Sequence, residues 1–340
     1  MNEDHKTSDY QLFTPVMAAS NRPSIRLDFS APERPNARGE APSNGSDSPP
    51  VRGLPSPSTA AAPVHSKTTK LDRHQLERIE QQLTARDHAV LQAIRKYRFL
   101  TTDQIGRLYI TDCSTKASHT RHQNLLTKRL ANHGLIRSLA RRVGGVGGGS
   151  SMQIWHLTEA GHRLLTLNDP GDHPRKRFVE PSSTFLAHTL AIAECAVQLT
   201  CLCRESEDLS LEQVDTEPPC WRAYKTGDKV SYLKPDLFAI TNYDSYEDRW
   251  FIEMDLDTES PMQVVEKCNI YLHYYYTGVE QKETGMFPLI VWIVPSTARK
   301  ERLKEYIRER LKGHPKMFLV ITPDELEKML RQFIGPEELC

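Results

Sequence analysis

The sequence predicts an α+β protein in which an N-terminal winged helix-turn-helix precedes a mixed α/β sheet domain of restriction-endonuclease-like (αβββαβ) order. Three observations lead to this prediction. Three helix patterns and a glycine-rich loop between two strands follow one another over 84–165. Helix and strand patterns then alternate over 180–335. Finally, 84–165 carry 13 Lys and Arg against 4 Asp and Glu, a charge of +9, whereas 166–340 carry 21 against 30, a charge of −9.

Composition divides the 340-residue chain into three parts. Residues 1–68 hold 10 of the 22 prolines among many Ser and Ala, without periodic apolar residues, which predicts a disordered Pro/Ser-rich tail. We expect a winged helix-turn-helix DNA-binding domain over 69–167 and a PD-(D/E)xK nuclease-like domain over 180–335.

Cysteine usage and hydropathy predict a cytoplasmic protein that has no contact with a membrane. The 7 cysteines are odd in number, and the first ten residues lack the apolar core of a signal peptide. Cys201 and Cys203 are expected to be buried helix cysteines, since zinc pairs have two intervening residues more often than one. The longest apolar runs fall short of the ~18 residues that a membrane span needs.

Capping signals and apolar spacing predict the helices of the first domain. After a short helix within 71–83, Thr84 caps a helix over 85–97, and Thr101 caps a second helix. A third helix is expected over 116–133, ended by a glycine. Its inward-facing residues are predicted to be Leu125, Leu126 and Leu130.

The opposite face of the third helix has the composition of a recognition helix. Asn and Gln suit adenine edges, whereas Arg and Lys suit guanine or phosphate. The alternative is an ordinary solvated helix face. The predicted DNA-binding residues on this helix are Lys116, His119, Thr120, Arg121, Gln123, Asn124 and Lys128.

A wing is expected after the third helix. A strand over 135–142 ends in Arg141 and Arg142, which are predicted to contact DNA. Glycines over 144–149 form the tip, and 154–157 form the returning strand. A phosphate-cradling nucleotide loop is less consistent with the sequence, because no Lys-Ser/Thr follows the glycines and the next element is a strand. A last helix is expected through Leu165.

The C-terminal part alternates helices and strands. Helices are predicted over 185–203, 261–276, 299–311 and 323–333, and strands over 211–217, 233–240, 250–255, 289–294 and 318–321. A loop with two prolines and Trp221 is expected between the first two strands.

Acidic residues at strand ends suggest a magnesium-dependent nuclease site. Asp236 opens one predicted strand, and Glu253 and Asp255 close the next, as metal ligands do in the PD-(D/E)xK fold. The motif normally has Lys where Asp255 stands, so Lys267 is the candidate catalytic cation and Lys234 its alternative. Mg²⁺ is the only cofactor implied, and only if the site is active. The alternative is an acidic loop on a non-catalytic domain.

Several neighbouring residues have secondary assignments. Glu194 and Glu217 are possible additional ligands, and Asp257 and Glu259 crowd the same strand end. His188 lies on an apolar helix and is expected to be a core histidine. The tyrosines at 271 and 274–276 are expected to lie partly on the buried face and partly on the exposed face of their helix.

Several blocks resemble the replication-relaxation proteins of bacterial plasmids and integrated mobile elements. These blocks are 99–105, 141–149, 157–161, 185–188, 235–236, 251–260 and the Val-Pro end of the strand that begins at Leu289. The resemblance spans roughly 84–322. It implies a role in replication or DNA relaxation of a mobile element through DNA binding, and it implies that the missing Lys at Asp255 is a family trait.

Three functions are compatible with these observations. The first is a protein that binds double-stranded DNA through the winged helix and contacts a second copy, a replication initiator or a relaxase. The second is a Mg²⁺-dependent nuclease or nickase that uses Asp236, Glu253, Asp255 and Lys267. The third is a transcription repressor. The substitution of Asp for Lys at position 255 favours the first.

Overall fold

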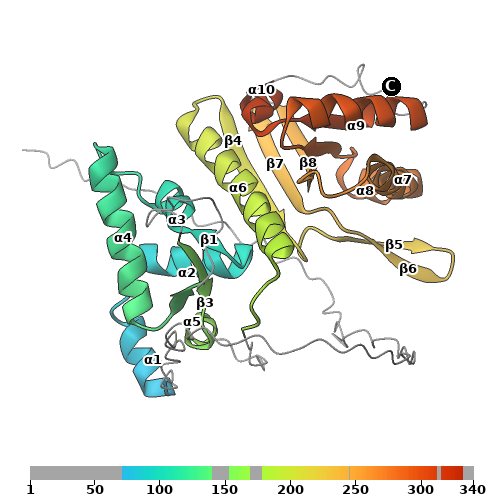
Figure 1. Ribbon diagram of the computed structural model, residues 1–340. Helices are drawn as coiled ribbons and strands as arrows, with labels where there is room; N and C mark the ends of the chain where they lie inside the picture. Colours follow the sequence, from blue (N-terminus) through green and yellow to red (C-terminus); the bar gives the residue numbers. More distant parts are fainter. Residues whose placement is uncertain (1–70, 140–152, 169–177, 245, 312–314, 332–340) are drawn as a thin grey trace, which may run out of the picture. The chain divides into compact units, whose positions relative to one another are not determined.

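The computed structural model describes residues 71–139, 153–168, 178–244, 246–311 and 315–331 (Figure 1). The protein is α+β, with helices and a mixed sheet, as the sequence predicts. The tail expected over 1–68 lies outside the described residues, as do Arg141, Arg142 and the glycine-rich tip.

The first part consists of helices around a small sheet. Its helices are α1 (Arg73–Glu80), α2 (Ala85–Tyr97), α3 (Thr102–Tyr109), α4 (Lys116–Asn132) and α5 (Glu159–Leu165). Its strands are β1 (Leu100–Thr101), β2 (Ile136–Ser138) and β3 (Ile154–Leu157), which pair antiparallel in the order β1-β3-β2.

Threonine caps fix where these helices begin. The side chains of Thr84, Thr101, Thr115 and Thr158 each accept a hydrogen bond from the backbone N–H three residues on, which satisfies a donor that the helix itself leaves unpaired. The predicted starts of α2 and α4 are therefore confirmed.

The inward face of α4 differs from the prediction at one position. Leu126 and Leu130 are buried, but Leu125 is 54% exposed, so its expected place in the core is wrong. Residues 125 and 126 differ by 100° around the helix, and only one of two adjacent leucines fits the buried stripe.

The second part is a five-stranded sheet with helices on both faces. Its strands are β4 (Leu209–Thr216), β7 (Leu237–Tyr243), β8 (Tyr246–Met254), β9 (Leu289–Ile293) and β10 (Phe318–Ile321), in the order β10-β9-β8-β7-β4. β8 pairs parallel with β9 and antiparallel with β7, so it joins the two halves of the sheet.

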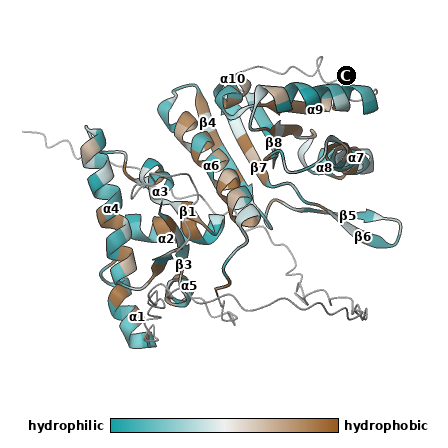
Figure 2. Cartoon of the chain, viewed as in Figure 1, coloured by the Kyte–Doolittle hydropathy of each residue, from teal (hydrophilic) through white to brown (hydrophobic). Residues whose placement is uncertain are grey.

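Alternation along the strands directs side chains to two cores. Leu237, Trp250 and Ile252 pack with α6 (Ser183–Glu205) on one face. Phe238 and Phe251 pack on the other face with α7 (Pro261–Thr277) and α9 (Thr297–Arg310). Figure 2 shows the contrast between apolar β7 and the mostly hydrophilic outer helix α9.

Three elements depart from the sequence prediction. The strand expected over 233–240 is two strands, because β6 (Lys229–Leu233) ends before β7 begins and instead forms a separate hairpin with β5 (Arg222–Thr226). A short helix α8 (Val279–Thr284) was not expected. The helix expected over 323–333 is a 3₁₀ turn at Pro323–Glu325 followed by α10 (Leu326–Leu330).

The sequence predicts that no apolar run is long enough to span a membrane, and helix α6 is an exception. Its 23 residues are long and apolar enough to cross a membrane by length and composition, the one such helix among the described residues. The core helix of a water-soluble protein passes the same test, and α6 packs on β4 and contributes nine buried side chains to the core. This helix is thus weak evidence for a membrane span.

Two helical glycines allow a matched test of packing in the first part. A Cβ at Gly161 would lie 2.2 Å from the backbone oxygen of Leu135, whereas a Cβ at Gly106 would meet only side-chain atoms of Gln123 and His119. We expect Gly161→Ala to lower the free energy of unfolding by about 1–3 kcal/mol, because backbone cannot move aside as a side chain can.

Gly106→Ala is the matched control, since both changes gain about 1 kcal/mol of helix propensity. Its effect on urea unfolding is expected to be smaller than that of Gly161→Ala. Equal effects would contradict the described approach of α5 to Leu135.

Candidate functional site

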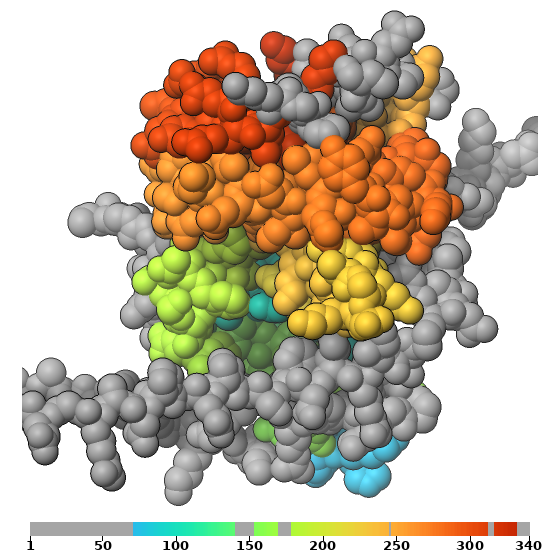
Figure 3. Space-filling view, turned by 90° about the vertical axis from the view of Figure 1, so that its right-hand side faces the viewer, coloured from blue at the N-terminus to red at the C-terminus, as the bar shows by residue number. Residues whose placement is uncertain are grey.

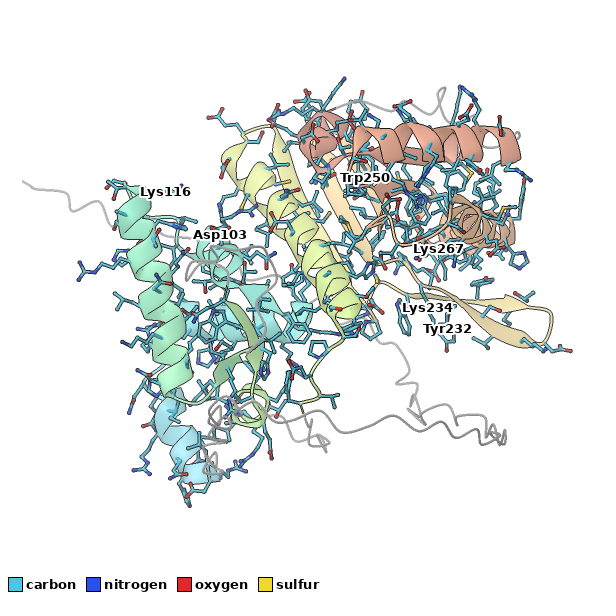
Figure 4. All side chains as sticks on the ribbon, viewed as in Figure 1. Asp103, Lys116, Tyr232, Lys234, Trp250 and Lys267 are labelled. Carbon is cyan, nitrogen blue, oxygen red and sulfur yellow. The ribbon has the colours of Figure 1, made fainter. Side chains whose placement is uncertain are left out.

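The outward face of α4 is the first candidate site, and it carries two exposed cations. Arg121 and Lys128 are exposed on the same side as Leu125, and Lys116 stands at the start of the helix (Figure 4). Within the part of the chain that the structure describes, neither Arg121 nor Lys128 forms an ion pair. Their charges are therefore available to an anionic partner.

Part of the predicted recognition surface does not face outward. Gln123 is only 2% exposed and packs against Gly106 of α3, so its assignment to the solvent-facing surface is wrong. His119 lies beside it and is half-buried, as are Thr120 and Asn124. The Thr120 hydroxyl donates to the Lys116 carbonyl oxygen at 2.9 Å. Gly106 lets α3 approach closely, and the sequence pattern of α4 does not reveal that approach.

A buried carboxylate holds α4 in place against α2. Asp87 is fully buried and accepts from the Thr84 backbone N–H at 2.8 Å, and it also pairs with Arg129 of α4. Burial alone would raise the pKa of Asp87, but these donors outweigh it and lower the pKa. Arg129 thus has an intramolecular partner in Asp87.

The second candidate site is a carboxylate cluster at the junction of β7, β8 and α7. Asp236 precedes β7, Glu253 lies near the end of β8, and Lys267 projects from α7 (Figure 4). Lys267 Nζ lies 2.5 Å from Glu253 Oε2, and Asp236 lies close enough to both side chains for its charge to affect their pKa values.

Glu253 is the most deeply buried member, with 0% of the residue exposed. Its second oxygen, Oε1, accepts from the Tyr271 hydroxyl at 2.5 Å. Burial and the charge of Asp236 raise the pKa of Glu253 to about 8, against the opposing effects of Lys267 and Tyr271. Burial alone would lower the pKa of Lys267, but the carboxylates of Glu253 and Asp236 outweigh it and raise that pKa.

His188 belongs to this cluster, so the expectation of a core histidine is wrong. Its Nε2 lies 3.2 Å from Asp236 Oδ1, and its side chain is 35% exposed. The interaction with Asp236 raises the pKa of His188. The other oxygen of Asp236 accepts from the Met254 backbone N–H at 2.8 Å. Although burial opposes it, the pKa of Asp236 is lowered by His188 and Lys267.

Asp255 does not join Asp236 and Glu253. It is 3% exposed and accepts from Arg299 Nε of α9 at 2.6 Å and from the Asp257 backbone N–H at 3.0 Å. Arg299 also donates to the Glu259 carbonyl oxygen at 2.7 Å. The prediction of Asp255 as a ligand is therefore corrected to a structural ion pair. Arg299 lies 44 residues away in the sequence, and no local signal pointed to it.

The remaining candidates are engaged elsewhere. Glu194 pairs with Arg107 of α3 at 2.5 Å and accepts from Gln104 at 3.0 Å, so it connects α6 to the first part of the chain. Glu217 follows β4 and lies close enough to influence the pKa of His188. Lys234 Nζ lies 4.4 Å from the centroid of the Trp221 ring and not beside the carboxylates.

A comparison with known protein families identifies the family of this chain. The model of the replication-relaxation family matches residues 91–290, which is more than half of the chain. The chain belongs to the replication-relaxation family. This membership indicates a role in the replication or relaxation of a plasmid or other mobile element. No curated protein matches the chain.

The carboxylates of this replication-relaxation protein do not fit a magnesium ion in the arrangement described. Magnesium prefers several oxygen ligands and retained water. Both oxygens of Glu253 and both of Asp236 already face donors of the protein, and Asp255 is held by Arg299. Among the described residues, no group of three or more His, Cys, Asp or Glu is placed to hold a metal ion.

The raised pKa of Glu253 predicts a pH-dependent stability. Because its folded pKa of about 8 exceeds the ordinary value of 4.5, its neutral form favours folding, and that contribution is lost as the pH rises towards and through 8. Relative to Glu253→Gln, the wild type should lose up to about 1.4 kcal/mol of unfolding free energy per pH unit within this window.

Chemical unfolding from pH 5 to 9 measures this difference. Glu266→Gln, at an exposed position of the same helix as Lys267, is the matched control. Its unfolding free energy should change with pH in the same way as that of the wild type. The opposite result, in which the wild type becomes more stable than Glu253→Gln as the pH rises, would contradict the prediction. It would show that Lys267 keeps the Glu253 carboxylate ionised.

Proposed function

We propose that this protein binds double-stranded DNA through a winged helix-turn-helix, with α4 as the recognition helix, and thereby acts in replication or relaxation of a mobile element. The observation that carries the proposal is the exposure of Arg121 and Lys128 on α4, neither of which forms an ion pair with another described residue. The order α2, α3, α4, β2 and β3 supports it, because a winged helix-turn-helix places its strand pair directly after the recognition helix.

The charge of the first part also supports this proposal. Residues 84–165 carry a charge of +9, which suits the phosphate backbone, whereas the rest of the described chain is acidic overall. Asp87 of α2 pairs with Arg129 of α4, and the side of α4 with Arg121 and Lys128 is exposed.

The C-terminal part has a different role in this proposal. Its strand order and the grouping of Asp236, Glu253 and Lys267 favour a nuclease-like fold. In this proposal, that fold contacts a second copy of the chain, a replication initiator or a relaxase. Glu194 and Arg107 connect the two parts and would let binding at one affect the other.

A second candidate function is DNA cleavage. It is favoured by one observation: Asp236 and Glu253 lie at the ends of adjacent strands, and Lys267 of α7 is close to both. Two observations disfavour cleavage. Donors of the protein already occupy the oxygens of Asp236 and Glu253, and Asp255 stands where the motif normally has Lys.

Replacement of Arg121 and Lys128 by Ala should weaken DNA binding. Each lost phosphate contact should reduce the slope of log affinity against log salt by about 0.9, and loss of a base contact should cost about 1–3 kcal/mol. Fluorescence anisotropy with labelled duplex over a KCl series measures both quantities.

The matched control replaces Lys304 and Arg308, two exposed cations on α9, by Ala. This control should bind as the wild type does. If the α4 variant also keeps full affinity and an unchanged salt slope, α4 is not the recognition helix.

A further inference from the structure

The β5–β6 hairpin carries a basic, partly apolar surface that no role proposed above uses. Its inner face packs on α7, where Tyr224 is 7% exposed and its ring lies 5.2 Å from that of Tyr274. Leu233 on the same face is buried. The hairpin is therefore anchored by one face only.

The outer face of this hairpin is open. Strand alternation places Ala223, Lys225, Val230 and Tyr232 together on it, because Ala223 pairs with Tyr232 and Lys225 with Val230. Val230 is 58% exposed and Tyr232 37% exposed. Figure 1 shows the hairpin projecting from the large sheet, and Figure 3 shows it in yellow at the surface.

Three lysines make the hairpin basic: Lys225 on the outer face, Lys229 next to the turn on the opposite face, and Lys234 at the base. Lys225, Lys229 and Lys234 are exposed, and among the described residues none of them forms an ion pair. Asp228 at the turn is the only acid from 222 to 234, although 166–340 as a whole carries a charge of −9. Arg222 is not available, because it pairs with Glu280 at 3.3 Å and stacks on Phe238. A local excess of positive charge in an acidic part of the chain indicates a polyanionic partner.

The position of the hairpin relates it to the carboxylate cluster. Lys234 lies over the Trp221 ring at the base of the hairpin, and the chain reaches Asp236 two residues later (Figure 4). The hairpin strands are about 17 Å long at ~3.3 Å per residue. A two-stranded ribbon fits the major groove of DNA, which is roughly 8.5 Å deep, so the hairpin is long enough to enter it.

We propose that the β5–β6 hairpin is a second duplex-DNA contact, in which Tyr232 and Val230 on its outer face contact the groove. Lys225 on that face, Lys229 beside the turn and Lys234 at the base bind phosphates. This inference rests on the proposed DNA-binding function and extends it to the C-terminal part. The chain then contacts DNA at two places, α4 and the hairpin.

The test uses the full chain and a labelled duplex that covers the region upstream of its own gene. Replacing the three hairpin lysines by Ala should lower the affinity at least tenfold near 0.1 M KCl and reduce the salt slope by about 2–3, since each phosphate contact contributes about 0.9. Tyr232→Ala, in a separate variant, should remove part of the hydroxyl-radical footprint at one end. Tyr232→Phe should retain that part.

The matched control replaces Lys304, Lys316 and Lys328, three exposed lysines outside the hairpin, by Ala. An equal loss of affinity in this control would overturn the inference, because it would reflect net charge alone. The inference would also be overturned if the hairpin variants kept the affinity, the salt slope and the footprint of the wild type. A hairpin variant that keeps its DNA affinity but changes its mass in sedimentation would assign the hairpin to a protein contact instead.

The Arg121→Ala, Lys128→Ala variant separates the two proposals on the same duplex. Loss of binding in that variant, together with full binding in the hairpin variants, removes the hairpin inference and leaves the proposed function in place. A wild type that binds no duplex in the micromolar range removes both.

Discussion

A fully buried carboxylate on the central strand constrains the C-terminal part of this protein. Glu253 lies in β8, the strand that joins the parallel and antiparallel halves of the sheet, and none of its surface is exposed. A buried carboxyl group needs hydrogen-bond partners, because loss of hydration costs several kcal/mol. Lys267 and Tyr271, one helical turn apart on α7, supply these partners, so α7 must present this face to β8.

The same constraint extends to the other face of the sheet. Asp236 lies close enough to Glu253 to raise its pKa, and Asp236 is stabilised by His188 of α6 and by the Met254 backbone. The helices on the two faces therefore meet at one group of charges. These acids have protein partners already, which is why binding, and not cleavage, is the function that we propose.

The elements with local signals were predictable from the sequence, whereas long-range contacts were not. Caps at Thr84 and Thr101 and the apolar runs of β9 and β10 are local, and these elements lie where expected. The hairpin was missed because its outer face is exposed, so that β6 lacks the apolar character of a core strand.

The candidate sites show the same division between local and long-range signals. Lys267 could be proposed because a cation near two strand-end acids is a known arrangement. The partner of Asp255 is Arg299, and the partner of His188 is Asp236, 48 residues away in the sequence; only tertiary structure brings these pairs together. Gln123 was misplaced because the close approach of α3 at Gly106 buries a position that has polar neighbours in the sequence.

The measurement that most directly tests whether this protein binds DNA without cutting it uses supercoiled plasmid that carries its own upstream region. Wild type and the Asp236→Ala, Glu253→Ala variant are incubated with it in Mg²⁺ or Mn²⁺, and the plasmid forms are separated on agarose. We expect both proteins to shift the plasmid and neither to nick or relax it. If the wild type nicks the plasmid in the presence of metal and the double variant does not, the protein cuts DNA and the carboxylate cluster is its active site.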